Sequence, residues 1–384
     1  MLRDLTDSEA RAALPLKWGA VPEGTIPAWV AEMDFAPPPA VTAALTAAVG
    51  RGMLGYSAFP GTAQPADLDA AFRGFAERHW GWDVPLDSST PVGDVVAGMR
   101  LALDELCPPG PVVVPLPCYP PFREVVALAG REAAYVGLDP DHDHDDRAAA
   151  ALDLAAVERH LEAGARTVLL CHPHNPLGRV AHRAELEALR DLVRAHGARV
   201  LVDEVHAPLV LPGQDRFVPY LSVDPDAVLV TSHSKTFGTP GLHTAQVVLM
   251  DPDETRRLRA VPVAANHGHS GLGMVAGSAA WRDSDLWLHA LRSRLRVNAE
   301  DLHDLVAEHL PQARLRPLEA TYLAWLDLRA YGVADPAAAA LEHGVRLAPG
   351  HDYQPGLEGH VRLNIATSEQ RLVEIVKRLA AALL

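Results

Sequence analysis

Short apolar runs alternate with helical patterns through the middle of the chain. Six of these runs are typical of strands, and they begin at Pro111, Ala134, Arg166, Arg199, Ala227 and Ala245. Between the third and fourth runs, residues 181–197 form a helical pattern whose apolar face comprises Leu186, Leu189, Leu192 and Val193. Strands that alternate with helices in this way predict an α/β fold with a mostly parallel sheet flanked by helices.

The pattern changes near residue 283. A long helical pattern covers residues 285–309, strand-like runs begin at Thr321 and Val361, and an amphipathic segment covers residues 368–384. We therefore expect a large domain over residues 45–285 and a smaller α+β domain built from residues 1–44 and 286–384.

The composition of the chain excludes some classes of binding partner. The chain has 384 residues, 48% of them hydrophobic, and a formal net charge of −15, from 34 basic and 49 acidic side chains. That charge argues against binding to nucleic acid or to an anionic membrane surface. The three cysteines, Cys107, Cys118 and Cys171, show no C-x-x-C spacing. An odd number of unspaced cysteines, and no apolar leader or run of about 18 apolar residues, predict a cytoplasmic protein.

An acidic stretch raises the question of a metal site. Residues Asp139 to Asp146 read D-P-D-H-D-H-D-D, with His142 and His144 as possible ligands. A solvated loop after a strand explains the stretch more simply, and we expect no metal. The chain also lacks the H-E-x-x-H, P-loop and G-x-G-x-x-G motifs, which argues against metalloproteases, NTPases and dinucleotide-binding enzymes.

Three of the apolar runs end in polar residues that a buried strand would not favour. Asn175 follows the third run, Asp203 ends the fourth, and Lys235 follows the fifth. Alone, each has an ordinary explanation in a turn, a helix cap or the surface. Together they are expected to meet, because ligands of open α/β sheets bind beyond the carboxyl ends of the strands. An amide, a carboxylate and a lysine suit pyridoxal phosphate (PLP), which has a phenolic oxygen, a ring nitrogen and an aldehyde.

Ordered motifs make the chain resemble a known family. The string S-H-S-K-T-F from Ser232 is similar to the lysine motif of fold-type I PLP enzymes, the aspartate aminotransferase-like fold. Within that fold the chain resembles the MalY/PatB group of cystathionine β-lyases, or cysteine C–S lyases. The resemblance covers nearly the whole chain, through K-W at Lys17, W-V-A-E-M-D-F from Trp29, G-Y at Gly55, P-C-Y-P-P-F from Pro117, C-H-P-H-N-P-L-G-R-V from Cys171, D-E-V-H from Asp203, T-Y-L-A-W-L-D from Thr321 and R-L-N-I-A from Arg362.

The resemblance implies a role for each matching residue. Lys235 would form the Schiff base with the cofactor and later move protons at the substrate Cα atom. Asp203 would pair with the ring nitrogen, and Tyr119 would stack on the ring. The remaining cofactor contacts would come from Asn175 at the phenolic oxygen, His206 near it, Ser232 and Ser234 at the phosphate, the backbone N–H groups of Val96 and Ala97, and Tyr56 of a neighbouring subunit. Arg362 would bind the substrate α-carboxylate.

Two segments depart from the family patterns. Many aminotransferases have G-x-R after the lysine motif, whereas His243 follows Gly241 and Leu242 here; the lyase group also tends to lack that arginine. The group usually reads K-T-F-N-x-A-G-L, whereas residues 235–242 read K-T-F-G-T-P-G-L. This change is either neutral or alters the substrate or the reaction branch. The string N-H-G-H from Asn266 is most simply a turn, with His267 or His269 as alternative substrate contacts.

The resemblance implies β-elimination from L-cystathionine or another L-cysteine S-conjugate, giving a thiol, pyruvate and ammonia. One alternative is another PLP reaction of such a conjugate in secondary metabolism, either aminotransfer or oxidative decarboxylation with deamination. A different alternative is a regulator that acts by binding a protein, as some members of the group do. We expect a homodimer with shared active sites, because Tyr56 is assigned to the site of a second chain.

Overall fold

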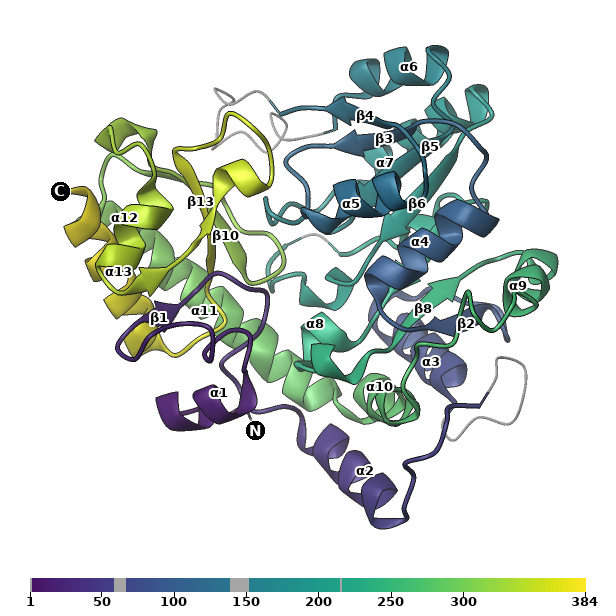
Figure 1. Cartoon of the computed structure of the whole chain (residues 1–384), viewed down its shortest axis with the longest axis horizontal. Helices are drawn as coiled ribbons and strands as arrows, with labels where there is room; N and C mark the ends of the chain where they lie inside the picture. Colours follow the sequence, from purple (N-terminus) through teal and green to yellow (C-terminus); the bar gives the residue numbers. More distant parts are fainter. Residues whose placement is uncertain (1, 59–66, 139–151, 215) are drawn as a thin grey trace.

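A seven-stranded sheet forms the centre of the larger part of the molecule (Figure 1). The computed structural model describes residues 2–58, 67–138, 152–214 and 216–384. In spatial order the strands are β2 (Ser89–Val92), β8 (Ala245–Val248), β7 (Val228–Thr231), β6 (Arg199–Asp203), β5 (Thr167–Cys171), β3 (Val112–Pro115) and β4 (Ala133–Val136). All six predicted strands are present. The seventh, β2, escaped prediction because its sequence, S-T-P-V, is short, polar at its start and interrupted by proline.

The sheet is parallel except at one end. Strands β7, β6, β5, β3 and β4 pair in parallel, whereas β8 runs antiparallel to both β7 and β2. The parallel pairs bring the carboxyl ends of β5, β6 and β7 to one edge of the sheet, where the predicted Asn175, Asp203 and Lys235 follow. This confirms the mostly parallel α/β architecture.

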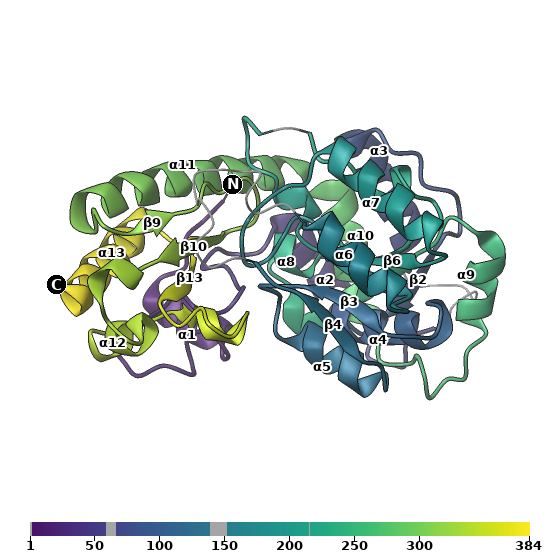
Figure 2. The ribbon, with the colours of Figure 1, turned by 90° about the horizontal axis from the view of Figure 1, so that it is seen from above.

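Helices cover both faces of this sheet (Figure 2). Val112 and Val114 of β3 pack into one apolar cluster and Val113 packs into another, because successive strand residues point to opposite faces. The first cluster takes side chains from α4 (Val95–Glu105), α5 (Pro121–Leu128) and α9 (Pro252–Arg259). The second takes them from α3 (Leu68–Trp80), α6 (Leu154–Glu162), α7 (Arg183–Ala195) and α10 (Gly271–Asp283). Burial on both faces explains why these strands are apolar throughout rather than alternating.

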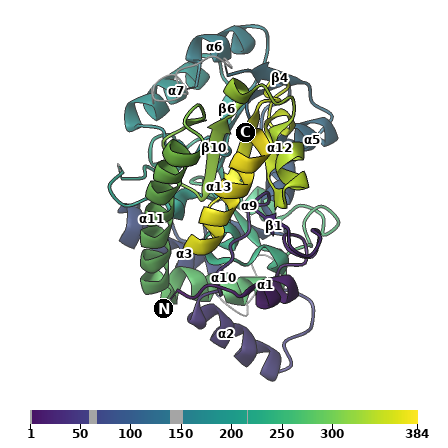
Figure 3. The ribbon, with the colours of Figure 1, turned by 90° about the vertical axis from the view of Figure 1, so that its left-hand side faces the viewer.

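A second, antiparallel sheet forms the smaller part. Its order is β12 (Ala348–Pro349), β13 (His360–Asn364), β10 (Leu323–Asp327) and β9 (Arg314–Leu315). Figure 3 shows α11 (Asp285–His309) and α13 (Glu369–Leu383) side by side in this part, near α12 (Pro336–Glu342). The predicted helices 285–309 and 368–384 are therefore confirmed.

The N-terminal segment belongs to both parts. Its helices are α1 (Asp7–Ala13) and α2 (Pro39–Gly50), and between them β1 (Ile26–Pro27) pairs in parallel with β11 (Val345–Arg346) of the smaller part. Helix α2 packs against α10 of the larger part and runs through the predicted boundary between residues 44 and 45. The predicted bounds of the two domains, 45–285 and 1–44 with 286–384, stay a prediction. In the stretches that the structure describes, no helix combines the length and apolar character of a membrane span.

Candidate active site

Three neighbouring strands deliver polar side chains to the same edge of the large sheet. Asp203 is the last residue of β6, and Asn175 lies in the loop that follows β5. Lys235 lies in the short helix α8 (Ser234–Phe237), which begins soon after β7. Parallel pairing of β5, β6 and β7 is what places the three positions together.

Asp203 is a carboxylate enclosed by the fold. It is buried, and its Oδ1 atom accepts a hydrogen bond from the Val205 N–H at 2.9 Å. Burial raises the pKa of Asp203 to about 7, although the Val205 N–H and the charge of Lys235 act to lower it. Such a carboxylate is best stabilised by a cationic partner that enters the site.

Lys235 is half-buried beside this carboxylate. Its Nζ atom donates to the Ala31 carbonyl at 3.3 Å. Burial lowers the pKa of Lys235, and nearby Arg362 lowers it further, while Glu32 and Asp203 raise it. The amine is therefore more easily deprotonated than an ordinary surface lysine, as a base or nucleophile must be.

Arg362 ties the smaller part of the molecule to this edge. It projects from β13, and its Nη1 donates to Asn175 Oδ1 at 3.0 Å while its Nη2 donates to the Trp29 carbonyl at 2.6 Å. Its guanidinium carbon lies 5.0 Å from the centre of the Tyr353 ring. Its Nε has no hydrogen-bond partner among the described residues. The arginine is thus oriented before any ligand binds.

His206 and Tyr119 complete the set that surrounds Lys235. Burial lowers the pKa of His206 to about 3, helped by the charges of Lys235 and Arg362, so its imidazole is neutral. Its Nδ1 atom is buried and has no partner within the described part of the chain. Burial also raises the pKa of Tyr119, which keeps its hydroxyl protonated.

The predicted phosphate contacts are partly engaged within the protein. Ser232 Oγ donates to the Thr244 carbonyl at 2.7 Å and accepts from the Ser234 N–H at 3.1 Å, which shapes the turn before Lys235. Val96 and Ala97 lie in the first turn of α4, but the Ala97 N–H donates to Asp94 Oδ1 at 2.8 Å. A phosphate at this helix end would have to compete with the Asp94 carboxylate for that N–H.

Tyr56 lies on a surface loop. Its side chain is 97% exposed, and its ring centre is 6.0 Å from that of His267. Residues 53–58 and five residues of 267–272 line a cavity of about 680 Å³. His269 is buried, with Nε2 3.4 Å from the Ala58 carbonyl, and Asn266 Nδ2 donates to the Pro91 carbonyl at 3.0 Å. The N-H-G-H string therefore braces the Tyr56 loop.

The segment that departs from the family after Lys235 has a clear local structure. Gly238 ends α8 in the left-handed conformation, with φ of +68°, which asparagine also tolerates. Thr239 Oγ1 lies 2.7 Å from His233 Nδ1. His243 is exposed, and its Nδ1 is 3.9 Å from Asp94 Oδ2. The exchange of asparagine for glycine is therefore compatible with an unchanged backbone.

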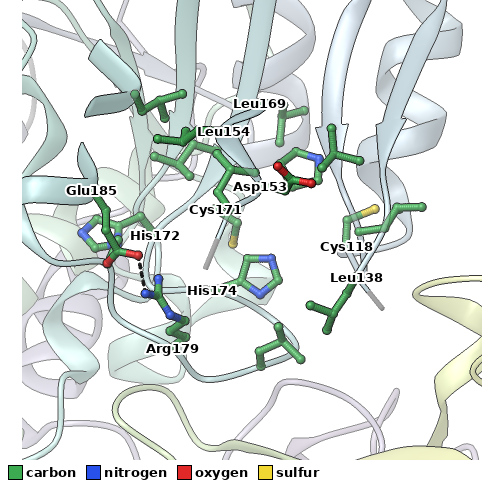
Figure 4. Close-up of a pocket in the computed structure, with 18 of the residues that line it drawn as sticks. Cys118, Leu138, Asp153, Leu154, Leu169, Cys171, His172, His174, Arg179 and Glu185 are labelled. Atoms are coloured by element: carbon green, nitrogen blue, oxygen red, sulfur yellow. Dashed lines mark hydrogen bonds and ion pairs between the residues drawn. The ribbon is translucent and has the colours of Figure 1, made fainter. Parts of the chain in front are cut away.

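A separate cavity lies beside this cluster (Figure 4). It encloses about 460 Å³, and its lining is mostly apolar, with Cys118, Cys171, His172 and His174 among the polar residues. Lys235, Asp203, Asn175, Tyr119 and Arg362 do not line it. The acidic stretch from Asp139 to Asp146, raised as a metal site, lies outside the described residues.

Sequence reasoning assigned no role to the segment that crosses in front of Lys235. The carbonyl groups of residues 29–32 accept hydrogen bonds from Arg362, Asn364 and Lys235, and the charge of Glu32 acts to raise the pKa of Lys235. The available signal was the string W-V-A-E-M-D-F, in which glutamate stands where the resembling group has aspartate.

Comparisons with known proteins agree with this geometry. The profile of the family "Aminotransferase class I and II" matches residues 30–379. Cystathionine β-lyase of Corynebacterium glutamicum is 32% identical over 96% of each chain, and cystathionine β-lyase PatB of Bacillus subtilis is 34% identical over 93% of this chain and 92% of its own. A solved structure from Corynebacterium diphtheriae superposes with a TM-score of 0.92 at 32% identity, covering 100% of this chain and 99% of that one.

These matches define the class of the protein. The chain belongs to the class I and II aminotransferase family and has its fold. Within that family, its full-length relatives include the cystathionine β-lyases, PatB and MalY, as the resemblance implied.

Proposed function

We propose that this protein is a PLP-dependent C–S β-lyase that cleaves L-cystathionine or another L-cysteine S-conjugate. The observation that carries the proposal is a half-buried lysine with a lowered pKa, set beside a buried aspartate and a pre-oriented arginine. The cystathionine β-lyases among its relatives support the same reaction class.

The site has the chemistry that PLP requires. Asp203 is buried without a direct cationic partner, and His206 Nδ1 and Arg362 Nε are buried polar atoms that lack partners in the described part of the chain. Lys235 would hold the aldehyde carbon, Asp203 the ring nitrogen, Asn175 the phenolic oxygen, and Tyr119 a face of the ring. The phosphate would bind near Ser232, Ser234, Val96 and Ala97, with His206 close to the ring.

Each protein group has a defined task in the reaction. PLP supplies an electron sink for the charge that develops at the substrate Cα atom. Arg362 binds the α-carboxylate and orients the substrate. Lys235 Nζ removes the proton from Cα, and its lowered pKa favours the neutral amine that this step needs. The buried Asp203 carboxylate balances positive charge on the ring nitrogen.

The product distinguishes elimination from its rivals. We expect the purified, PLP-loaded protein to convert L-cystathionine or an S-alkyl cysteine to pyruvate, ammonia and a free thiol without any keto acid acceptor. Pyruvate and thiol are measured in parallel. A product that keeps its sulfur side chain, as a keto acid or an aldehyde, would contradict the lyase proposal and identify aminotransfer or oxidative decarboxylation.

We also infer a homodimer, because Tyr56 is almost fully exposed in the single chain. Light scattering of the holoenzyme should give about twice 41.2 kDa. Mixing Lys235→Ala and Tyr56→Phe protomers should restore one unaltered site per hybrid dimer, if Tyr56 serves the neighbouring site. No recovery above that of the two variants alone would contradict the shared site.

The cysteines fit a reducing compartment. Cys107, Cys118 and Cys171 are all free and buried, and burial raises the pKa of each thiol. We infer a cytoplasmic location from this use of cysteine.

A further inference from the structure

The N-terminal strap, residues 29–34, crosses the active site, and its backbone is held there by hydrogen bonds from side chains. Its carbonyl groups accept hydrogen bonds in succession from Arg362 Nη2 at Trp29 (2.6 Å), Asn364 Nδ2 at Val30 (2.7 Å), Lys235 Nζ and Tyr322 Oη at Ala31 (3.3 and 3.1 Å), and Asn364 Nδ2 and Lys17 Nζ at Glu32 (2.6 and 2.9 Å). The strap therefore has little freedom to move relative to Lys235.

The Glu32 side chain follows directly after the strap carbonyl that accepts the Lys235 hydrogen bond, and one of its carboxylate oxygens has unmet hydrogen-bonding capacity. It is half-buried, and its Oε2 atom is shielded from solvent with no hydrogen-bond partner among the described residues. Glu32 directly follows Ala31 in the chain, and the Ala31 carbonyl accepts a hydrogen bond from Lys235 Nζ. The Glu32 carboxylate and the Lys235 amine are not hydrogen-bonded, so their interaction acts through space.

The neighbouring charges indicate that Lys235 is the cation with which the Glu32 carboxylate chiefly interacts. Lys17 already has a carboxylate partner, because its Nζ atom lies 2.8 Å from Asp34 Oδ1. Both of these side chains are only 1% exposed. Burial raises the pKa of Glu32, and so does the charge of Asp34, whereas the charges of Lys235 and Lys17 and a hydrogen bond from the Lys17 backbone N–H lower it. Two other charged groups act on Lys235: Arg362 disfavours its positive charge, and Asp203 favours it.

We propose that Glu32 is a positioning residue whose carboxylate stabilises positive charge on the nitrogen of Lys235. This inference rests on the proposed function, in which the proton leaves the substrate Cα atom and binds Lys235 Nζ, while the electron pair of the C–H bond stays with the substrate and cofactor. The nitrogen becomes cationic in that step. Asp203 has the ring nitrogen to balance, so Glu32 is the carboxylate left to balance Lys235.

The test uses the PLP-loaded protein without substrate. The visible spectrum of the lysine–cofactor linkage changes when its nitrogen loses a proton, so a pH titration reports the pKa of that nitrogen. In Glu32→Gln, which keeps the size and removes the charge, we expect that pKa to fall by about one unit. Glu32→Asp, which keeps the charge, should recover most of the shift. Thermal unfolding of each variant reports whether its fold is intact.

An exposed carboxylate that precedes the strap in the sequence gives the matched control. Glu23→Gln should leave the spectroscopic pKa unchanged. With substrate, Glu32→Gln should lower kcat about tenfold, the equivalent of one pKa unit, and change KM little, because Glu32 does not hold the α-carboxylate. An unchanged spectroscopic pKa in Glu32→Gln would overturn the inference.

Different results would contradict the lyase reaction and the role of Glu32. A shifted pKa in Glu32→Gln, together with no pyruvate from any S-conjugate, would support the role of Glu32 and reject the lyase reaction. Normal lyase turnover in the parent protein, together with an unshifted pKa in the variant, would reject the role of Glu32 and leave the lyase reaction standing.

Discussion

Replacing Lys235 with alanine should abolish turnover and the covalent attachment of PLP. Lys235 supplies both the amine that joins the cofactor and the base that removes the Cα proton, and neither of the other two lysines is placed to replace it. The chain contains three lysines: Lys17 is buried in its pair with Asp34, and Lys377 is exposed on α13. Loss of a positioned base alone costs roughly 10²- to 10⁴-fold in rate, so we expect a loss of kcat of at least about 10²-fold.

The measurement combines kinetics with mass spectrometry. Borohydride reduction of the PLP-loaded parent protein should fix the cofactor to the peptide that carries Lys235, and pyruvate release gives kcat. Lys377→Ala is the matched control and should retain full activity and labelling. Cofactor attached to another lysine, or turnover in Lys235→Ala within tenfold of the parent, would show that the site is assigned wrongly.

The same variant addresses the alternative of a protein-binding regulator. Among the described residues the Lys235 side chain makes one hydrogen bond, to the Ala31 carbonyl, so its removal should leave the fold and the outer surface intact. A biological effect that survives in Lys235→Ala would show that the effect does not depend on turnover.

Replacing Arg362 with lysine should lower kcat/KM about 10²-fold or more. The planar guanidinium reaches Asn175 and the Trp29 carbonyl together, and the resemblance assigns it the substrate carboxylate. A lysine has the same charge but cannot make the paired geometry, and removing one partner of a buried charged interaction costs about 2–5 kcal/mol. The loss should be greater in KM than in kcat.

Steady-state kinetics with one S-conjugate measures both parameters. Arg346→Lys is the control, because Arg346 stacks 3.9 Å from the Trp29 ring centre yet donates to the distant Ala20 carbonyl rather than to Asn175. Equal losses in Arg362→Lys and Arg346→Lys would mean that the strap around Trp29 is disturbed in general, and would remove the carboxylate role from Arg362.

Local pattern was enough to predict much of the architecture. The six predicted strands and the helices at 183–195, 285–309 and 369–383 follow from runs and periodicity, because most of their apolar residues face a core. The chemistry of Asn175, Asp203 and Lys235 was also visible, because polar residues directly after buried strands stand out. Their role as a PLP site came from the ordered motifs, since each residue alone has an ordinary explanation.

Contacts between distant segments were beyond the sequence. Nothing local shows that Ala31 next to Glu32 accepts a hydrogen bond from Lys235, that Arg362 reaches Asn175, or that Ala97 gives its N–H to Asp94. The pKa shifts of Asp203, Lys235 and His206 likewise come from burial by both parts of the molecule. The sequence by itself determined which groups are present and which strands carry them. Only the tertiary structure decided their charge states and partners, because desolvation and distance depend on segments that are far apart along the chain.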